Sequence, residues 1–72
     1  MDPMTEPLLR RFKSDHLPER LRLVAAPCEA LARNYVETIP VGPELLAGLR
    51  KLLEAKDCFV RAELDRTGER VI

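Results

Sequence analysis

Residues 40–57 read PVGPELLAGLRKLLEAKD, and this stretch turns the chain back and starts a long helix. The Pro-Val-Gly that opens it interrupts any preceding helix, because proline removes a backbone donor and glycine weakens a helix. Pro43 has the fixed backbone angle of a first helical turn, where its missing N–H breaks no bond. Glu44 then puts a negative charge near the positive end of the helix dipole. We expect a helix from Pro43 to about Leu64.

An amphipathic pattern precedes this turn. Apolar residues recur at alternating spacings of four and three, which is the stripe of a helix packed along a neighbour. They are Leu17, Leu21, Val24, Cys28, Leu31 and Tyr35. The pattern predicts a helix from Pro18 to about Glu37. Pro27 lies inside it and crowds the carbonyl of Leu23, at a cost of about 3 kcal/mol, so we expect a kink there or a break into two helices.

The N-terminal segment reads as a short helix followed by a connector. Residues 6–12 place leucines and Phe12 on one side, and so short a helix needs docking to be stable. Residues 13–18 end in proline, and the residue before a proline avoids helical angles, so this segment is expected to link two helices. We expect tails at residues 1–5 and 66–72.

No segment shows the apolar–polar alternation that is typical of a strand. Short connections such as residues 38–42 join antiparallel neighbours. The sequence therefore predicts an all-α fold, a short N-terminal helix plus an antiparallel helical hairpin, in a single domain over residues 1–72.

The second long helix carries more apolar surface than one facing helix can cover. One stripe consists of Leu45, Leu49, Leu52 and Phe59, and a neighbouring stripe consists of Leu46, Leu53, Val60 and Leu64. A hairpin alone would leave part of this arc in water. A chain of 72 residues also has a marginal core, which small proteins supplement with disulfides, a metal or a partner chain. We therefore expect a homo-oligomer.

The two cysteines and one histidine of the sequence do not supply a metal site. Cys28 and Cys58 lie far apart, and His16 alone cannot complete a zinc ligand set with them. We expect two buried thiols and no cofactor. The N-terminal residues do not show the charged-then-apolar pattern of a leader peptide, so we expect a cytoplasmic protein rather than a secreted, disulfide-bonded one.

The overall charge argues against two classes of partner. Twelve basic residues balance 12 acidic ones, so bulk charge supports neither a DNA or RNA polymer nor a membrane surface as partner. No apolar run approaches the roughly 20 residues of a membrane helix. We expect neither polymeric nucleic acid nor membrane as a partner.

The sequence gives little support to catalysis. Asp15 and His16 are adjacent, but a base and its orienting carboxylate must face each other, and nothing in the sequence arranges that. No glycine-rich phosphate loop occurs. We therefore expect no enzyme, and a minimal hydrolase using His16 is a remote alternative.

Basic residues form two sets that suit phosphate binding. One set surrounds Phe12 and consists of Arg10, Arg11, Lys13, His16, Arg20 and Arg22. The other lies on the second long helix and consists of Arg50, Lys51, Lys56 and Arg61. Arginine binds phosphate through parallel N–H donors. Ordinary solvated cations are the alternative, and composition alone favours it.

Several short elements carry a family resemblance. They are His16-Leu17-Pro18-Glu19-Arg20, the Leu31-Ala32 step, Pro40 followed by Glu44, and Leu49-x-Lys51-Leu52-x-Glu54-Ala55. Together they resemble the small phage proteins that sequester cyclic nucleotide immune signals, the anti-CBASS and anti-Thoeris sponges, which share a helical-hairpin domain. The match spans roughly residues 12–64.

The resemblance implies a helical homo-oligomer, often a hexamer, that holds cyclic oligonucleotides intact between protomers in an infected or lysogenic host cell. Under it, Phe12 would stack on a base, and His16 would orient the ligand. Contacts to phosphates would come from Lys13, Arg20, Arg50 and Lys51. Arg66 and Thr67 would lie near a separate trinucleotide pocket. The alternative is a small helical adaptor that inserts its apolar arc into a protein partner.

Overall fold

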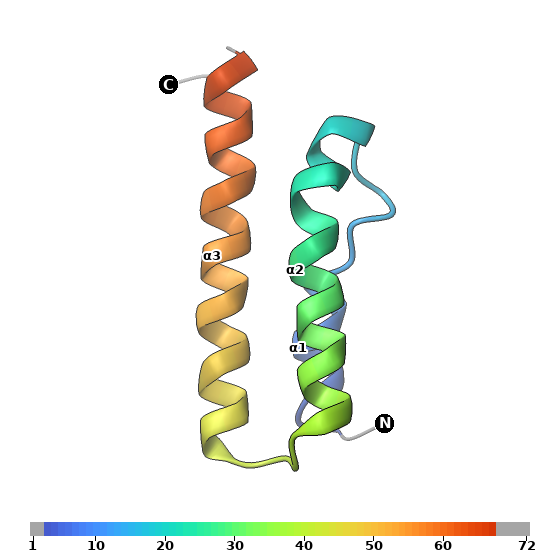
Figure 1. Ribbon diagram of the computed structural model, residues 1–72, viewed down its shortest axis with the longest axis vertical. Helices are drawn as coiled ribbons and strands as arrows, with labels where there is room; N and C mark the ends of the chain where they lie inside the picture. The colour runs from blue at the N-terminus through green and yellow to red at the C-terminus, as the bar shows by residue number, and fades with distance from the viewer. Residues whose placement is uncertain (1–2, 68–72) are drawn as a thin grey trace.

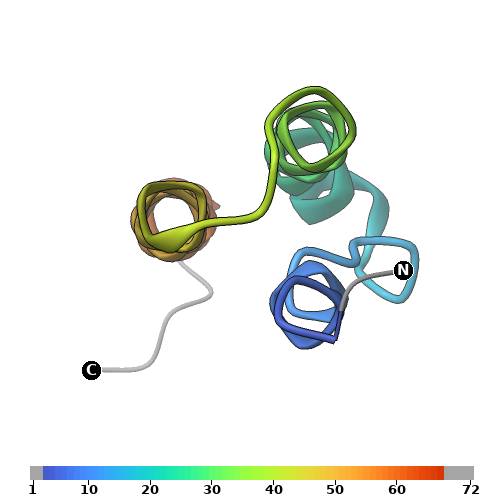
Figure 2. The same cartoon turned by 90° about the horizontal axis from the view of Figure 1, so that it is seen from below.

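The computed structural model describes residues 3–67, which form three helices joined by two short segments. Helix α1 spans Glu6–Arg10, α2 spans Glu19–Thr38 and α3 spans Pro43–Thr67. Figure 1 shows α2 and α3 running antiparallel along the long axis of the molecule. Figure 2 looks along the helices and shows α1 lying beside α2, on one side of the hairpin. Residues 3–67 contain no strand, so the all-α prediction is confirmed.

The turn between the long helices follows the expected chemistry. α3 begins at Pro43, and its first turn carries Glu44. The backbone N–H of Leu46 donates to the carbonyl of Gly42 at 3.1 Å, which closes that turn. At its other end α3 continues past Leu64 to Thr67. The predicted tail at residues 66–72 is therefore wrong for residues 66 and 67, which are helical. Residues 68–72 lie outside the described part of the chain.

Helix α2 runs without interruption through Pro27, so the predicted alternative of a break there is wrong. Pro27 is exposed, and Leu23 retains 70% of its surface exposure. The carbonyl that Pro27 leaves without a donor therefore lies on a face that water can reach, which lowers the penalty for an internal proline.

The seam between α2 and α3 joins small residues to large ones. The buried residues of α2 are Leu21, Ala25, Cys28 and Ala32. Across from them lie Leu45, Leu49 and Leu53 of α3, in the same buried cluster as Cys28 and Ala32. Small side chains on one helix allow the two backbones to approach, while leucines fill the remaining space.

The residues buried between α2 and α3 differ in part from the apolar stripes that the sequence predicted. Leu31 and Tyr35 of α2 are 44% and 42% exposed, and Phe59 of α3 is 55% exposed. On α2 the alanines share the same helical repeat and occupy the seam in place of the larger residues. Of the two stripes predicted on α3, Phe59 is the exposed member, and the remaining members are buried or half-buried. The other large exposed apolar residues among residues 3–67 lie outside those stripes, at Met4, Leu23, Leu31, Tyr35, Ile39 and Val41.

The N-terminal segment completes the core. Leu9 is 4% exposed and Phe12 is fully buried, and both belong to the cluster that contains Leu45 and Leu49. Thr5 is also fully buried, and its carbonyl accepts the N–H of Leu9 at 2.9 Å. The predicted tail at residues 1–5 is therefore wrong for Thr5, while residues 1–2 lie outside the described range. Over residues 3–67, none of the helices is both long enough and apolar enough to cross a membrane.

Replacing the buried aromatic ring should separate the N-terminal segment from the hairpin. We expect Phe12→Ala to lower the free energy of unfolding by about 3–5 kcal/mol, because it leaves a large cavity in the core. The matched control is Phe59→Ala, at a ring that is 55% exposed. Urea denaturation at low protein concentration measures both. Equal losses for the two variants would contradict this description of the core.

Candidate anion-binding groove

A groove of ≈ 490 Å³ lies where the segment after α1 passes along α3. It is lined by Arg10, Arg11, Lys13, His16, Leu17, Lys56, Asp57, Val60 and Arg61. Basic side chains predominate, and Asp57 is the lone carboxylate among these lining residues. We call it the cationic groove. The structure thus brings members of the two basic sets of the sequence, far apart along the chain, to one place.

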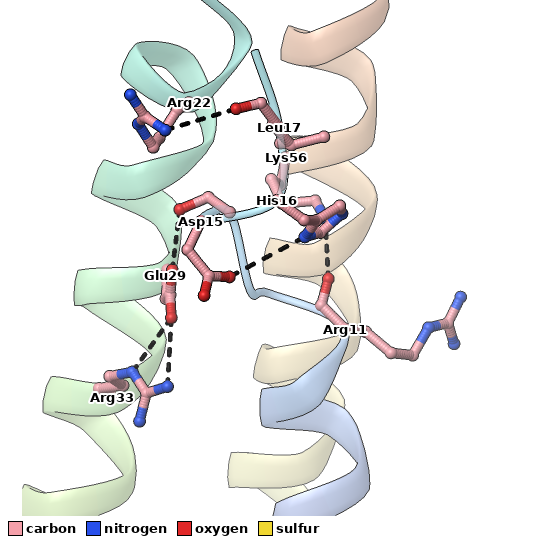
Figure 3. A network of polar contacts seen from close by, with 9 residues as sticks. Arg11, Asp15, His16, Leu17, Arg22, Glu29, Arg33 and Lys56 are labelled. Atoms are coloured by element: carbon pink, nitrogen blue, oxygen red, sulfur yellow. Dashed lines mark hydrogen bonds and ion pairs between the residues drawn. The ribbon is translucent and has the colours of Figure 1, made fainter. Parts of the chain in front are cut away.

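A lysine from α3 holds the floor of the groove together. Lys56 Nζ donates to the backbone carbonyl of Arg11 at 2.8 Å (Figure 3). The same Nζ lies 3.6 Å from Asp57 Oδ1. The Lys56 side chain is only 11% exposed. Lys56 therefore acts as a strut between α3 and the N-terminal segment, with its charge partly balanced by Asp57.

The other side of the connector is tied to α2. Ser14 is 4% exposed, and its hydroxyl donates to Glu29 Oε1 at 2.9 Å. The second oxygen of that carboxylate accepts from Arg33 Nε at 3.3 Å and Nη2 at 3.1 Å (Figure 3). Glu29 and Arg33 lie four residues apart, a spacing typical of a solvated helix-surface pair, but here they position the connector. The signal for this role, a serine that reaches another helix, is not visible in the sequence.

Two cations of the groove have side chains that make no hydrogen bond or ion pair with any of residues 3–67. They are Arg11 and Lys13. Figure 3 shows the guanidinium of Arg11 pointing away from the polar network around the connector. Other cations are engaged: Arg10 pairs with Glu6 at 2.8 Å, and Arg61 Nη2 lies 3.3 Å from Cys58 Sγ. Arg11 and Lys13 are therefore the groups most available to an anion.

His16 also lines the groove but is weakly held. Its Nδ1 lies 4.0 Å from Asp15 Oδ1, with side chains that are 69% and 85% exposed (Figure 3). At that separation and exposure the carboxylate does not orient the ring as a catalytic base requires. The ring can still stack on a base or donate to a phosphate.

The structure separates the remaining candidates from this groove. Phe12 is fully buried, so its ring is not available to stack on a ligand; docking of the N-terminal segment uses it for the core instead. Lys51 lines a different groove, and Arg50 is exposed without lining either groove. Arg20 is likewise outside the lining of the cationic groove.

The last two candidates lie at the end of α3. Arg66 is engaged with a neighbouring carboxylate: its Nε and Nη2 donate to Glu63 Oε1 and Oε2 at 3.0 and 2.6 Å. Thr67 is the last residue of α3, and its side chain lies outside the described part of the structure. We call this pair of parallel hydrogen bonds the Arg66–Glu63 fork; Arg66 could bind a ligand only if these bonds were broken.

The thiols differ from each other. Cys28 is buried as expected, but Cys58 is exposed, because it lies on the outer side of α3 beside Arg61. The prediction of two buried thiols is therefore wrong for Cys58. Over residues 3–67, no three His, Cys, Asp or Glu side chains gather in a way that could hold a metal ion.

Comparisons with protein-family models, with curated proteins and with solved structures find no match for this chain.

The fork between Arg66 and Glu63 predicts a pH effect. The hydrogen bond from Arg66, assisted by its charge, lowers the pKa of Glu63 below its usual value of 4.5. The stabilisation by Glu63 is thus complete above the ordinary glutamate pKa and is lost as the pH falls through the lowered pKa. In an NMR titration, Arg66→Ala should move the Glu63 pKa upward, whereas Arg22→Ala should leave it unchanged. An identical Glu63 titration in the wild type and Arg66→Ala would contradict the fork.

Proposed function

We propose that this chain is a non-enzymatic sponge for cyclic oligonucleotide second messengers. It binds cyclic dinucleotides or trinucleotides at subunit interfaces and holds them intact. In a phage or prophage this would block CBASS-type immune signalling, as the resemblance of the sequence implies. The single observation that carries the proposal is the cationic groove, in which Arg11 and Lys13 are free to contact phosphates.

The size and chemistry of the groove suit such a ligand. Its volume of ≈ 490 Å³ lies within the usual range of small-molecule sites, about 300–1,000 Å³. Guanidinium groups bind phosphate oxygens through parallel N–H donors and also stack on bases. Since Phe12 is buried, the stacking surface in this proposal is the face of Arg11 or His16.

The groove is open on its outer side, which supports a site shared between subunits. Its lining comes from residues 10–17 and 56–61, and none of it comes from α2. A ligand seated there would keep one face in water unless a second copy covered it. In the proposal, Arg50, Lys51 and Arg20 reach the ligand from such a second copy.

The proposal assigns no bond cleavage to the groove. Hydrolysis of a phosphodiester needs a positioned base or a positioned nucleophile. His16, the titratable base of the lining, is exposed and is not oriented by Asp15. Binding without chemistry is therefore the function that the geometry favours.

The alternative is an adaptor that docks an exposed apolar surface on a protein partner. Leu31 and Tyr35 of α2, and Ile39 directly after its end, are 44%, 42% and 44% exposed. Such an adaptor would not respond to cyclic nucleotides, so one experiment separates the two functions.

Purified protein should show a raised melting temperature with cyclic di- or trinucleotides, because a ligand that binds only the folded state stabilises it. After heat denaturation, chromatography of the released nucleotide should show it intact. A linear mononucleotide serves as the control ligand. Degraded nucleotide would indicate an enzyme, and the absence of any shift would refute the sponge and favour the adaptor.

Charge removal in the groove should weaken binding without affecting the fold. We expect Arg11→Gln combined with Lys13→Gln to raise the dissociation constant at least about tenfold, since each lost charged hydrogen bond removes more than about 1 kcal/mol. The matched control is Arg22→Gln, at an exposed arginine outside the groove whose Nη1 bonds the Leu17 carbonyl at a long 3.5 Å. Isothermal titration at two salt concentrations measures both. Equal affinities of the two variants would place the site elsewhere.

A further inference from the structure

A glycine in the middle of α3 has no explanation within this chain. Glycine weakens a helix interior relative to alanine, so a glycine at position 48 calls for a physical reason. A Cβ atom added at Gly48 would meet no other atom within 4 Å. Packing inside the described chain therefore does not require the small residue, and the space above the Gly48 backbone is open.

Gly48 lies in an apolar groove distinct from the cationic one. This groove has a volume of ≈ 450 Å³ and is lined by Tyr35, Ile39, Glu44, Leu45, Gly48, Leu49, Lys51 and Leu52. None of its lining belongs to α1. Tyr35 and Ile39 are 42% and 44% exposed there, so large side chains remain in water beside the open glycine.

The charges of this groove are arranged for pairing with a copy of itself. Glu44 and Lys51 belong to its lining and have opposite signs. Along a helix, Glu44, Gly48 and Lys51 fall on one face, at offsets of four and three residues, and Gly48 lies near the midpoint. A two-fold axis at Gly48 would place Glu44 of each copy beside Lys51 of the other.

We propose that this surface is a two-fold interface between two copies of the chain, in which their α3 helices cross at Gly48. The missing side chain lets the two backbones approach at the crossing point. Tyr35 and Ile39 become covered, and the two Glu44–Lys51 pairs close the rim on either side. An isologous interface of this kind pairs residue i with j and j with i, which this pair of charges satisfies.

The dimensions of the molecule permit such an interface. Its broad face measures 40 × 20 Å, which can accommodate the roughly 800 Å² per partner that is typical of a stable complex. A small ligand would explain the open space at Gly48 but not the self-complementary charges. The inference does not require the proposed nucleotide ligand: apart from Lys51, which the proposed function also uses, the residues of this interface lie outside the proposed binding site.

Charge reversal tests the interface without any nucleotide present. Glu44→Lys and Lys51→Glu should each raise the dissociation constant for self-association about tenfold, because attraction at both rim pairs becomes repulsion. Mixing these two single variants should restore association, and so should the double variant Glu44→Lys/Lys51→Glu. Sedimentation equilibrium over a concentration series measures all of them. Arg22→Glu, outside the groove, is the control and should associate like the wild type.

A second variant tests the crossing point. Gly48→Gln should raise the helix content and the melting temperature of the monomer, because glutamine is the better helix former. It should also abolish association, since a long side chain occupies the contact between the backbones. The proposal would be overturned by a wild-type chain that stays monomeric, by single charge reversals that associate normally, by mixtures that fail to recover, or by unchanged association of Gly48→Gln.

Discussion

The burial of Phe12 is the interaction on which the rest of this structure depends. Its ring is fully buried in the cluster that joins α2 and α3. The short helix α1 spans only Glu6–Arg10 and could not persist alone in water. Because Phe12 docks it, the backbone of the next residues runs beside α3, where Lys56 can reach the Arg11 carbonyl. The cationic groove exists only while this segment remains docked.

The hairpin has two faces of different chemistry because α1 covers only one of them. On the covered side, the N-terminal segment contributes cations and closes the core. On the other side, the large apolar residues Tyr35 and Ile39 remain partly exposed beside α3. One helix, α3, therefore serves both faces: its later part supplies Lys56 and Arg61 to the cationic groove, and its earlier part lines the apolar groove.

Local signals in the sequence were sufficient for the helices but not for their rotation. Pro43 and Glu44 correctly indicated where α3 begins, because helix starts depend on neighbouring residues. The predicted buried face of α2 was wrong in part. Leucines and alanines recur at the same helical spacing, and which of them is buried depends on the distance between the two helix backbones. The cationic groove also could not be predicted from short stretches of sequence. Its key contact joins residues 45 positions apart, and nothing in either segment specifies the other.

The balance of charge helps to define what the cationic groove can hold. The chain as a whole has a formal net charge of zero, whereas the groove gathers basic groups around a single carboxylate. A polymer of nucleic acid binds along an extended basic track and gains from many phosphate contacts. A cationic region of ≈ 490 Å³ on a neutral protein offers only a few such contacts. It therefore suits a compact anion with few phosphates, which is the class of ligand named in the proposed function.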